Sequence, residues 1–119
     1  MNGYLSTHVL DTARGIPAAG MSIEVWYLGV VGEGRRFLKK VVTNANGRTD
    51  EPLLASDQFH AGEYELVFEV GRYFAATMPD AEHHFLNEVP VRFAVENGNE
   101  HYHVPLLVSP YAYSTYRGS

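Results

Sequence analysis

Histidine is the side chain best suited to acid–base chemistry near neutral pH, and this chain of 119 residues has six of them. His8 lies between Leu5 and Leu10, in a stretch with the composition of a β-strand. His101 and His103 are two residues apart in another such stretch, and side chains with that spacing share one face of a strand. These three histidines are the first candidates for chemistry.

The remaining three histidines have polar surroundings. His60 lies in the loop-like sequence SDQFHAGE, and His83 and His84 lie in a polar segment that is expected to form a helix. We interpret all three as solvated surface residues. His8 and His103 also admit a plainer interpretation, a structural histidine that hydrogen-bonds at an interface, and the residue pattern alone leaves both interpretations open.

A turn and the C-terminal segment add two arginines and a tyrosine to the candidate residues. Arg48 follows NANG at 44–47, a strong turn signal because Asn and Gly accept positive φ. The sequence STYRGS at 114–119 ends the chain and contains Tyr116 and Arg117. Chain ends usually fray, so this pair is either incidental or docked where a hydroxyl and a charge are needed. An arginine after a tight turn and a Tyr-Arg terminus favour a functional role for the histidines.

The composition excludes several classes of protein. The chain has no cysteine, so disulfides, thiolate nucleophiles and thiolate metal ligands are absent. Its net charge of −5 argues against a general nucleic-acid binder. No apolar run approaches the ~18 residues of a membrane span, and no secretory signal pattern is visible. We therefore expect a cytoplasmic protein without nucleic-acid or membrane partners, with periplasm and peroxisome left open.

Short strands separated by turn signals account for most of the chain. A length of 119 residues with 45% hydrophobic residues fits a single domain, residues 1–119. The sequence PDAEHHFLNEV at 79–89 begins like a helix and predicts one short helix. Eight strands spaced about ten residues apart are typical of an all-β sandwich. The strands are predicted at 4–11, 21–29, 35–43, 48–54, 62–74, 90–96, 101–109 and 112–118.

The strands that carry the candidate histidines have apolar residues on both faces. In the first strand His8 shares a face with Leu10, and the opposite face is also apolar. In the seventh strand His103 shares a face with Leu107, and again the opposite face is apolar. A sandwich sheet needs only one apolar face for its own core. The second face therefore suggests an assembly interface that also holds polar groups.

Motifs in four segments of the chain match a known family. The segments are LSTHVLDTARGIPAAG (5–20), TNANGRTDEPLL (43–54), YELVFEVGRYF (64–74) and HYHVPLLVSPYAYSTYRGS (101–119). They resemble the transthyretin-related proteins that act as 5-hydroxyisourate hydrolases, and the ending YRGS is distinctive of that family. The resemblance implies a transthyretin (prealbumin)-like sandwich of two four-stranded sheets with one short helix. It also implies a homotetramer whose central channel is lined by the sheets that contain the first, fourth, seventh and eighth strands, with sites at subunit interfaces.

The resemblance implies a specific site and reaction. His8, Arg48 and His103 match the family's catalytic set. The substrate would be 5-hydroxyisourate, the unstable product of urate oxidation in purine degradation, and water would open its N1–C6 amide. A neutral histidine can take the proton of that water, and a guanidinium can stabilise the oxyanion. No metal or cofactor is implied. The residues implied to bind the substrate are His8, Arg48, Ser114, Tyr116, Arg117 and Ser119.

Two rival interpretations remain open. One is a transthyretin-like carrier that binds a small molecule in the channel without turnover. The other is a zinc hydrolase, since His8, His101 and His103 could offer three imidazoles, although a His-x-His pair on one strand face is a weak signal. The sequence also leaves open which histidine is the general base.

Overall fold

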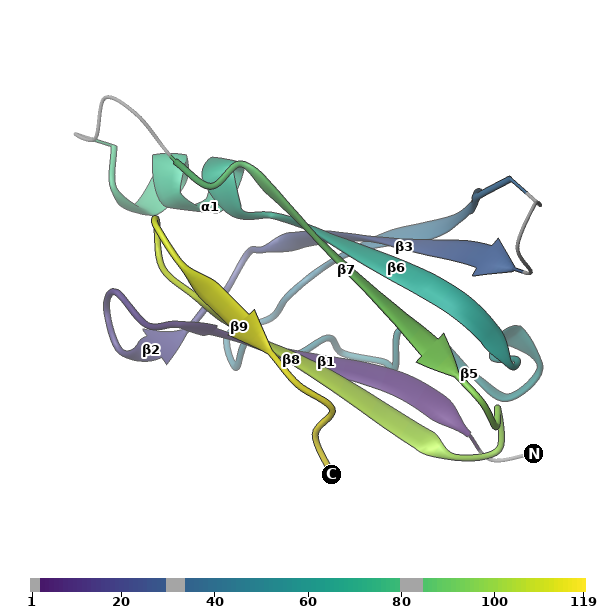
Figure 1. Cartoon of the computed structure of the whole chain (residues 1–119). Helices are drawn as coiled ribbons and strands as arrows, with labels where there is room; N and C mark the ends of the chain where they lie inside the picture. Colours follow the sequence, from purple (N-terminus) through teal and green to yellow (C-terminus); the bar gives the residue numbers. More distant parts are fainter. Residues whose placement is uncertain (1–2, 30–33, 80–84) are drawn as a thin grey trace.

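Two β-sheets lie face to face in the structure (Figure 1). This computed structural model describes residues 3–29, 34–79 and 85–119. One sheet has the order β2 (Ile16–Pro17), β1 (Tyr4–Asp11), β8 (His101–Val108) and β9 (Tyr113–Thr115), and β5 (Leu54–Ala55) also pairs with β1. The other sheet has the order β4 (Arg36–Val42), β3 (Ser22–Gly29), β6 (Gly62–Glu69) and β7 (Glu88–Val95). The predicted all-β sandwich is confirmed, with β2 as an additional short strand.

The parallel pair β1 and β8 forms the middle of the first sheet, although the two strands are almost a chain length apart in sequence (Figure 1). Ser6 is opposite His103 in the pairing, and His8 is opposite Pro105. The strands predicted first, fourth, seventh and eighth all fall in this sheet, as the family resemblance implied. The histidine-bearing strands are therefore neighbours.

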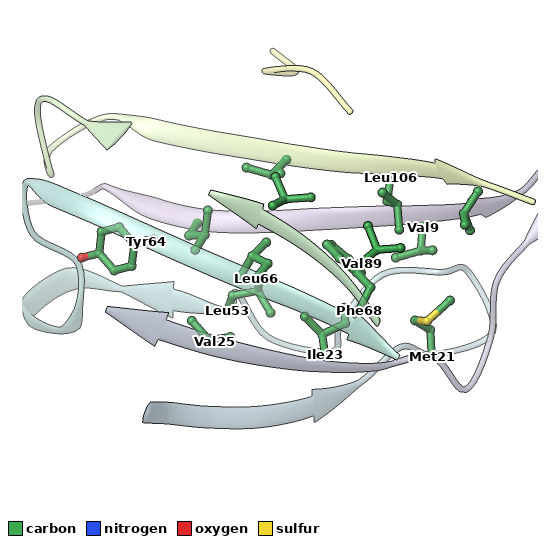
Figure 2. Close-up of a cluster of buried hydrophobic side chains, with 14 of the residues drawn as sticks. Val9, Met21, Ile23, Val25, Leu53, Tyr64, Leu66, Phe68, Val89 and Leu106 are labelled. Atoms are coloured by element: carbon green, nitrogen blue, oxygen red, sulfur yellow. The ribbon is translucent and has the colours of Figure 1, made fainter. Parts of the chain in front are cut away.

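Alternation along the strands sends one face of each sheet into a shared apolar core (Figure 2). On β1 the side chains of Leu5 and Val9 are fully buried, and on β8 Leu106 is fully buried. Burial of one such side chain stabilises the fold by about 1.5–3 kcal/mol. A shift of β1 by one residue would expose these residues and bury their polar neighbours, so the core fixes which face of β1 stays outside.

The helix lies earlier in the chain than predicted. The strand predicted at 62–74 ends at Glu69, and α1 (Val70–Thr77) follows at once. Val70, Tyr73 and Phe74 are buried, and their spacing of three and four residues fits the period of a helix. The packing of this helical face against the core therefore favours a helix over a continuation of β6 beyond Glu69. Within the residues that the structure describes, no helix is long and apolar enough to cross a membrane.

The helix predicted at 79–89 is not found where the structure describes that segment. Residues 80–84 lie outside the described part of the chain, and residues 85–87 are not helical. The backbone N–H of Leu86 donates to the Pro110 carbonyl at 3.2 Å, which ties this segment to the β8–β9 turn. The prediction was wrong for residues 85–89, because β7 begins before 89.

The strand predicted at 48–54 is reduced to the two residues of β5, which pair with the start of β1. Pro52 has no N–H to donate to a neighbouring strand, so extended pairing begins only after it. The N–H of Leu53 donates to the Leu5 carbonyl at 2.8 Å. The residues that follow Pro52 are thereby held against the start of β1.

Candidate active site

The face of β1 and β8 that points away from the core gathers three histidines. His8, His101 and His103 are half-buried, whereas the alternating residues Thr7 and Val9 are buried in the core. The predicted two-faced pattern of these strands is confirmed. Because the strands are parallel neighbours, histidines that are far apart in the sequence lie on one continuous surface.

Ser6 joins two of these histidines. Its Oγ lies 2.8 Å from Nε2 of His101 and 2.8 Å from Nδ1 of His103. The His101 ring also stacks on Tyr4, with the ring centroids 4.0 Å apart. These contacts hold both imidazoles of β8 in fixed orientations.

His8 is oriented by the backbone of the turn that precedes Arg48. Its Nε2 lies 2.9 Å from the Asn46 carbonyl oxygen, which can only accept a hydrogen bond. Nε2 of His8 therefore carries a proton and donates it. In the neutral ring this leaves Nδ1 with the free lone pair, so Nδ1 is the atom that can take up a proton.

Arg48 is placed by a tight turn fastened to β1. The side-chain Oδ1 of Asn44 accepts the N–H groups of Asn46 and Arg48, at 2.9 and 3.2 Å. Gly47 has φ +75°, and a Cβ there would lie 2.3 Å from the Val9 carbonyl oxygen, so only glycine fits. The NANG signal thus brings a guanidinium to the edge of the histidine face.

A hollow of about 190 Å³ opens beside Arg48. Its lining includes Ser6 from β1, so it adjoins the hydroxyl that contacts His101 and His103. The remaining lining comes from the segment after the turn, Thr49 to Pro52, and from Thr7. The hollow lies in one copy of the chain and is open to solvent on its outer side.

The electrostatics of the face favour neutral histidines. Burial lowers the pKa of His8, and the Arg48 guanidinium lowers it further, against the hydrogen bond to Asn46. Burial likewise lowers the pKa of His103, with added contributions from Arg48, His101 and His8. Both shifts favour the neutral imidazole, the form in which a histidine can act as a base.

The last residues of the chain are docked against β8. The N–H of Gly118 donates to the His103 carbonyl at 2.7 Å and forms an isolated bridge with that residue. A Cβ on Gly118 would lie 2.6 Å from Cδ2 of His103, so the glycine backbone packs directly on the catalytic candidate's ring. The terminus is therefore a neighbour of the histidine face.

Tyr116 and Arg117, predicted to bind substrate, point elsewhere within this chain. The Arg117 guanidinium lies over the Tyr102 ring at 3.9 Å and donates to Glu100 and to the His101 carbonyl, at 3.3 and 3.2 Å. Tyr102 alternates with the histidines and faces the opposite side of β8. Tyr116 and Arg117 border a separate, mostly apolar hollow of about 240 Å³ next to β7.

The two serines predicted to bind substrate differ in position. Ser114 in β9 is opposite Leu107 in the pairing, so it shares the outer face with His103. Ser119 is exposed and follows the docked Gly118. The structure thus brings together His8, Arg48 and His103, with Ser114 on the same sheet face.

Sequence reasoning missed Ser6 and the contact that His101 makes with it. Ser6 is two residues from His8 and His101 is two residues from His103, so the alternation of the strands already placed them on the same face as these histidines. Among the described residues, no group of three or more His, Cys, Asp or Glu side chains is arranged to hold a metal ion. His101 and His103 instead converge on a hydroxyl group.

Comparison with known proteins finds relatives that match nearly the whole chain. A 5-hydroxyisourate hydrolase of Halalkalibacterium halodurans is 52% identical over the full length of both chains, and one of Mesorhizobium japonicum is 56% identical over 98% of this chain and 93% of its own. The solved 5-hydroxyisourate hydrolase of Klebsiella pneumoniae is 34% identical, with a TM-score of 0.78 over 98% of this chain and 99% of that one.

Two other solved structures share the fold. An (S)-allantoin synthase is 42% identical with a TM-score of 0.91, and the match covers 99% of this chain but 44% of that one. Transthyretin from Sparus aurata is 28% identical with a TM-score of 0.84, over 96% of this chain and 95% of its own. Residues 5–118 also match the model of one protein family. The chain belongs to the HIUase/transthyretin family.

Proposed function

We propose that this protein hydrolyses 5-hydroxyisourate at its N1–C6 amide to give 2-oxo-4-hydroxy-4-carboxy-5-ureidoimidazoline. Relatives named 5-hydroxyisourate hydrolase support this assignment, because they match the chain over nearly their whole length at about half identity. The observation that carries the proposal is the cluster of His8 and His103 on one sheet face with Arg48 at its edge. It supplies a base and a cation without needing a covalent nucleophile.

The reaction uses the atoms that the structure leaves available. A neutral imidazole, at Nδ1 of His8 or Nε2 of His103, takes a proton from water while the water oxygen bonds to C6. The C6–N1 bond then breaks, and the proton passes to N1. Arg48 stabilises the negative oxygen on C6 through its fixed charge. A positioned base contributes about 10²–10⁴-fold and an oxyanion donor about 10²–10³-fold.

The assembly proposed with this function is a homotetramer with sites at subunit interfaces. Leu10 and Leu107 are only half-buried on the histidine face, so apolar surface remains there for another copy to cover. Burial beneath a second copy would also lower the dielectric around the site. Active protein that sediments as a monomer at assay concentration would contradict this proposal.

The direct test is turnover of the substrate. Freshly generated 5-hydroxyisourate, mixed with the protein, should lose its ultraviolet absorbance much faster than in buffer, because a positioned base and cation accelerate the reaction beyond its spontaneous rate. The second candidate function is a transthyretin-like carrier, favoured by the likeness to Sparus aurata transthyretin. Saturable binding with decay no faster than in buffer would establish the carrier and refute the hydrolase.

Removal of residues 117–119 should lower activity far more than stability. The truncation deletes the Gly118 backbone that packs on His103 and an exposed ion pair of Arg117 with Glu100 at 3.3 Å. We expect the Tm to fall by about 5 °C or less and kcat/KM by at least about tenfold, since small displacements of a reacting group are costly. Thermal melts and steady-state kinetics measure both.

The Arg117→Ala variant separates the two predictions made for the terminus. It removes the guanidinium but keeps the Gly118 backbone against His103. Because Arg117 is engaged with Tyr102 and Glu100 in this chain, we expect its loss to cost less activity than the truncation. Equal losses would mean that Arg117 closes the site directly, as the family resemblance implied.

A further inference from the structure

The hydroxyl of Ser6 is the only described group that bridges two imidazoles of the site. Ser6 is opposite His103 in the parallel register, 97 residues away in sequence, and its Oγ is 2.8 Å from both His103 Nδ1 and His101 Nε2. Among the described residues, no hydrogen bond reaches Nε2 of His103. That nitrogen is therefore free to take up a proton, whereas Nδ1 is engaged with Ser6.

A serine hydroxyl has one proton, so it can donate to only one of the two rings. In one arrangement Nδ1–H of His103 donates to Ser6, and Ser6 donates to Nε2 of His101. His103 then has a free lone pair on Nε2. In the other arrangement His101 donates to Ser6 and Ser6 donates to Nδ1 of His103, which puts the ring proton on Nε2 and leaves His103 unable to act as a base.

We propose that Ser6 and His101 are positioning residues that hold His103 in the tautomer with a free Nε2. The proposal rests on the hydrolase function, with His103 as a base. Once Nε2 of His103 has taken a proton, both nitrogens of that ring carry hydrogen. Only the arrangement in which Nδ1–H of His103 donates to Ser6 is then possible. His101 Nε2 accepts a hydrogen bond from the Ser6 hydroxyl, whose oxygen is then free to accept one from the His103 imidazolium that forms during the reaction. This is the role of a third group that orients a catalytic base.

Neighbouring contacts hold the hydrogen bonds of Ser6 with His101 and His103 in place. Tyr4 stacks on His101 at 4.0 Å between centroids and with 16° between planes, which fixes the direction of His101 Nε2. Gly118 packs against the His103 ring. The two rings thus have little freedom to turn away from Ser6.

The kinetic test uses three substitutions in the proposed unit and one control substitution. Ser6→Ala should lower kcat by about 10–100-fold with KM nearly unchanged, since it removes a hydrogen bond to a group that becomes charged. Ser6→Thr keeps the hydroxyl on a strand and should restore most of kcat. His101→Phe keeps a ring for Tyr4 to stack on but removes the acceptor, and should lower kcat in the same direction. Ser22→Ala, a half-buried strand serine in the other sheet, is the matched control.

A second measurement does not depend on turnover. Long-range ¹H–¹⁵N NMR of the imidazoles in the wild-type protein should show His103 protonated at Nδ1, and Ser6→Ala should show a mixture of tautomers. Wild-type His103 protonated at Nε2, or an unchanged tautomer or kcat in Ser6→Ala, would overturn the proposal. The expected tautomers in a wild-type protein that fails to turn over 5-hydroxyisourate would refute the hydrolase while supporting Ser6 and His101 as the groups that fix His103.

Discussion

The kcat of a His103→Asn variant is expected to fall by about 10²–10⁴-fold, the contribution of a positioned general base. Asparagine cannot take a proton at neutral pH, whereas the lowered pKa of His103 keeps its imidazole ready to do so. The bond from Gly118 to residue 103 uses the backbone carbonyl, so the docked terminus should remain. Steady-state kinetics with fresh substrate, beside a thermal melt, measure the loss of activity without loss of fold.

His60→Ala is the control for this prediction. His60 is exposed in the loop before β6 and should change neither kcat nor KM. A His103→Asn variant with near-wild-type turnover would remove His103 from the mechanism. His8→Asn, assayed in parallel, assigns the base between the two histidines, because the smaller loss belongs to the ring that only orients substrate.

An Arg48→Met variant is expected to lose about 10²–10³-fold in kcat, the contribution of one donor to a developing oxyanion. Methionine keeps much of the apolar stem but has no charge. Arg48 is exposed and the turn is held by Asn44 and Gly47, so the Tm should change little. Arg48→Lys should recover only part of the loss, because an ammonium lacks the planar fork of a guanidinium.

The same Arg48→Met variant should also move the pH profile. Arg48 is one of the causes that lower the pKa of His8 and His103, so its removal raises both pKa values. The base must be neutral, and a higher pKa keeps it protonated to a higher pH. The acid limb of kcat/KM should therefore shift to higher pH. Arg72→Met removes a charge from an exposed arginine on α1 and is the control. An equal shift of the acid limb in this variant would contradict a local effect of Arg48 on the two histidines.

The alternation of residues in β1 and β8 was enough to place the site on a sheet face. Side chains two residues apart lie on the same side of a strand, so His8 and His103 had to occupy the faces opposite Val9 and Val104. The NANG turn was equally readable, because positive φ at Gly47 is a local requirement. The strand faces and the outward-facing histidines are therefore readable from short stretches of the sequence.

The helix shows where local patterns were ambiguous. The sequence VGRYF at 70–74 is compatible with a continuation of the preceding strand. The spacing of Val70, Tyr73 and Phe74 also fits one face of a helix. Packing decided between the two, since all three side chains are buried in the helical arrangement. In the same way, only the tertiary structure shows that the Arg117 guanidinium lies over the Tyr102 ring within this chain.

The sequence by itself determined that histidines and an arginine would be presented by strands and a tight turn. Only the tertiary structure decided that Ser6 lies between His101 and His103, because that contact depends on the register of two strands separated by nearly the whole chain. Register is set by the burial of the core face and by strand pairing, which are sums over many distant contacts. A local pattern can fix the side of the strand on which a residue lies, but a residue's partner across the sheet follows from the fold.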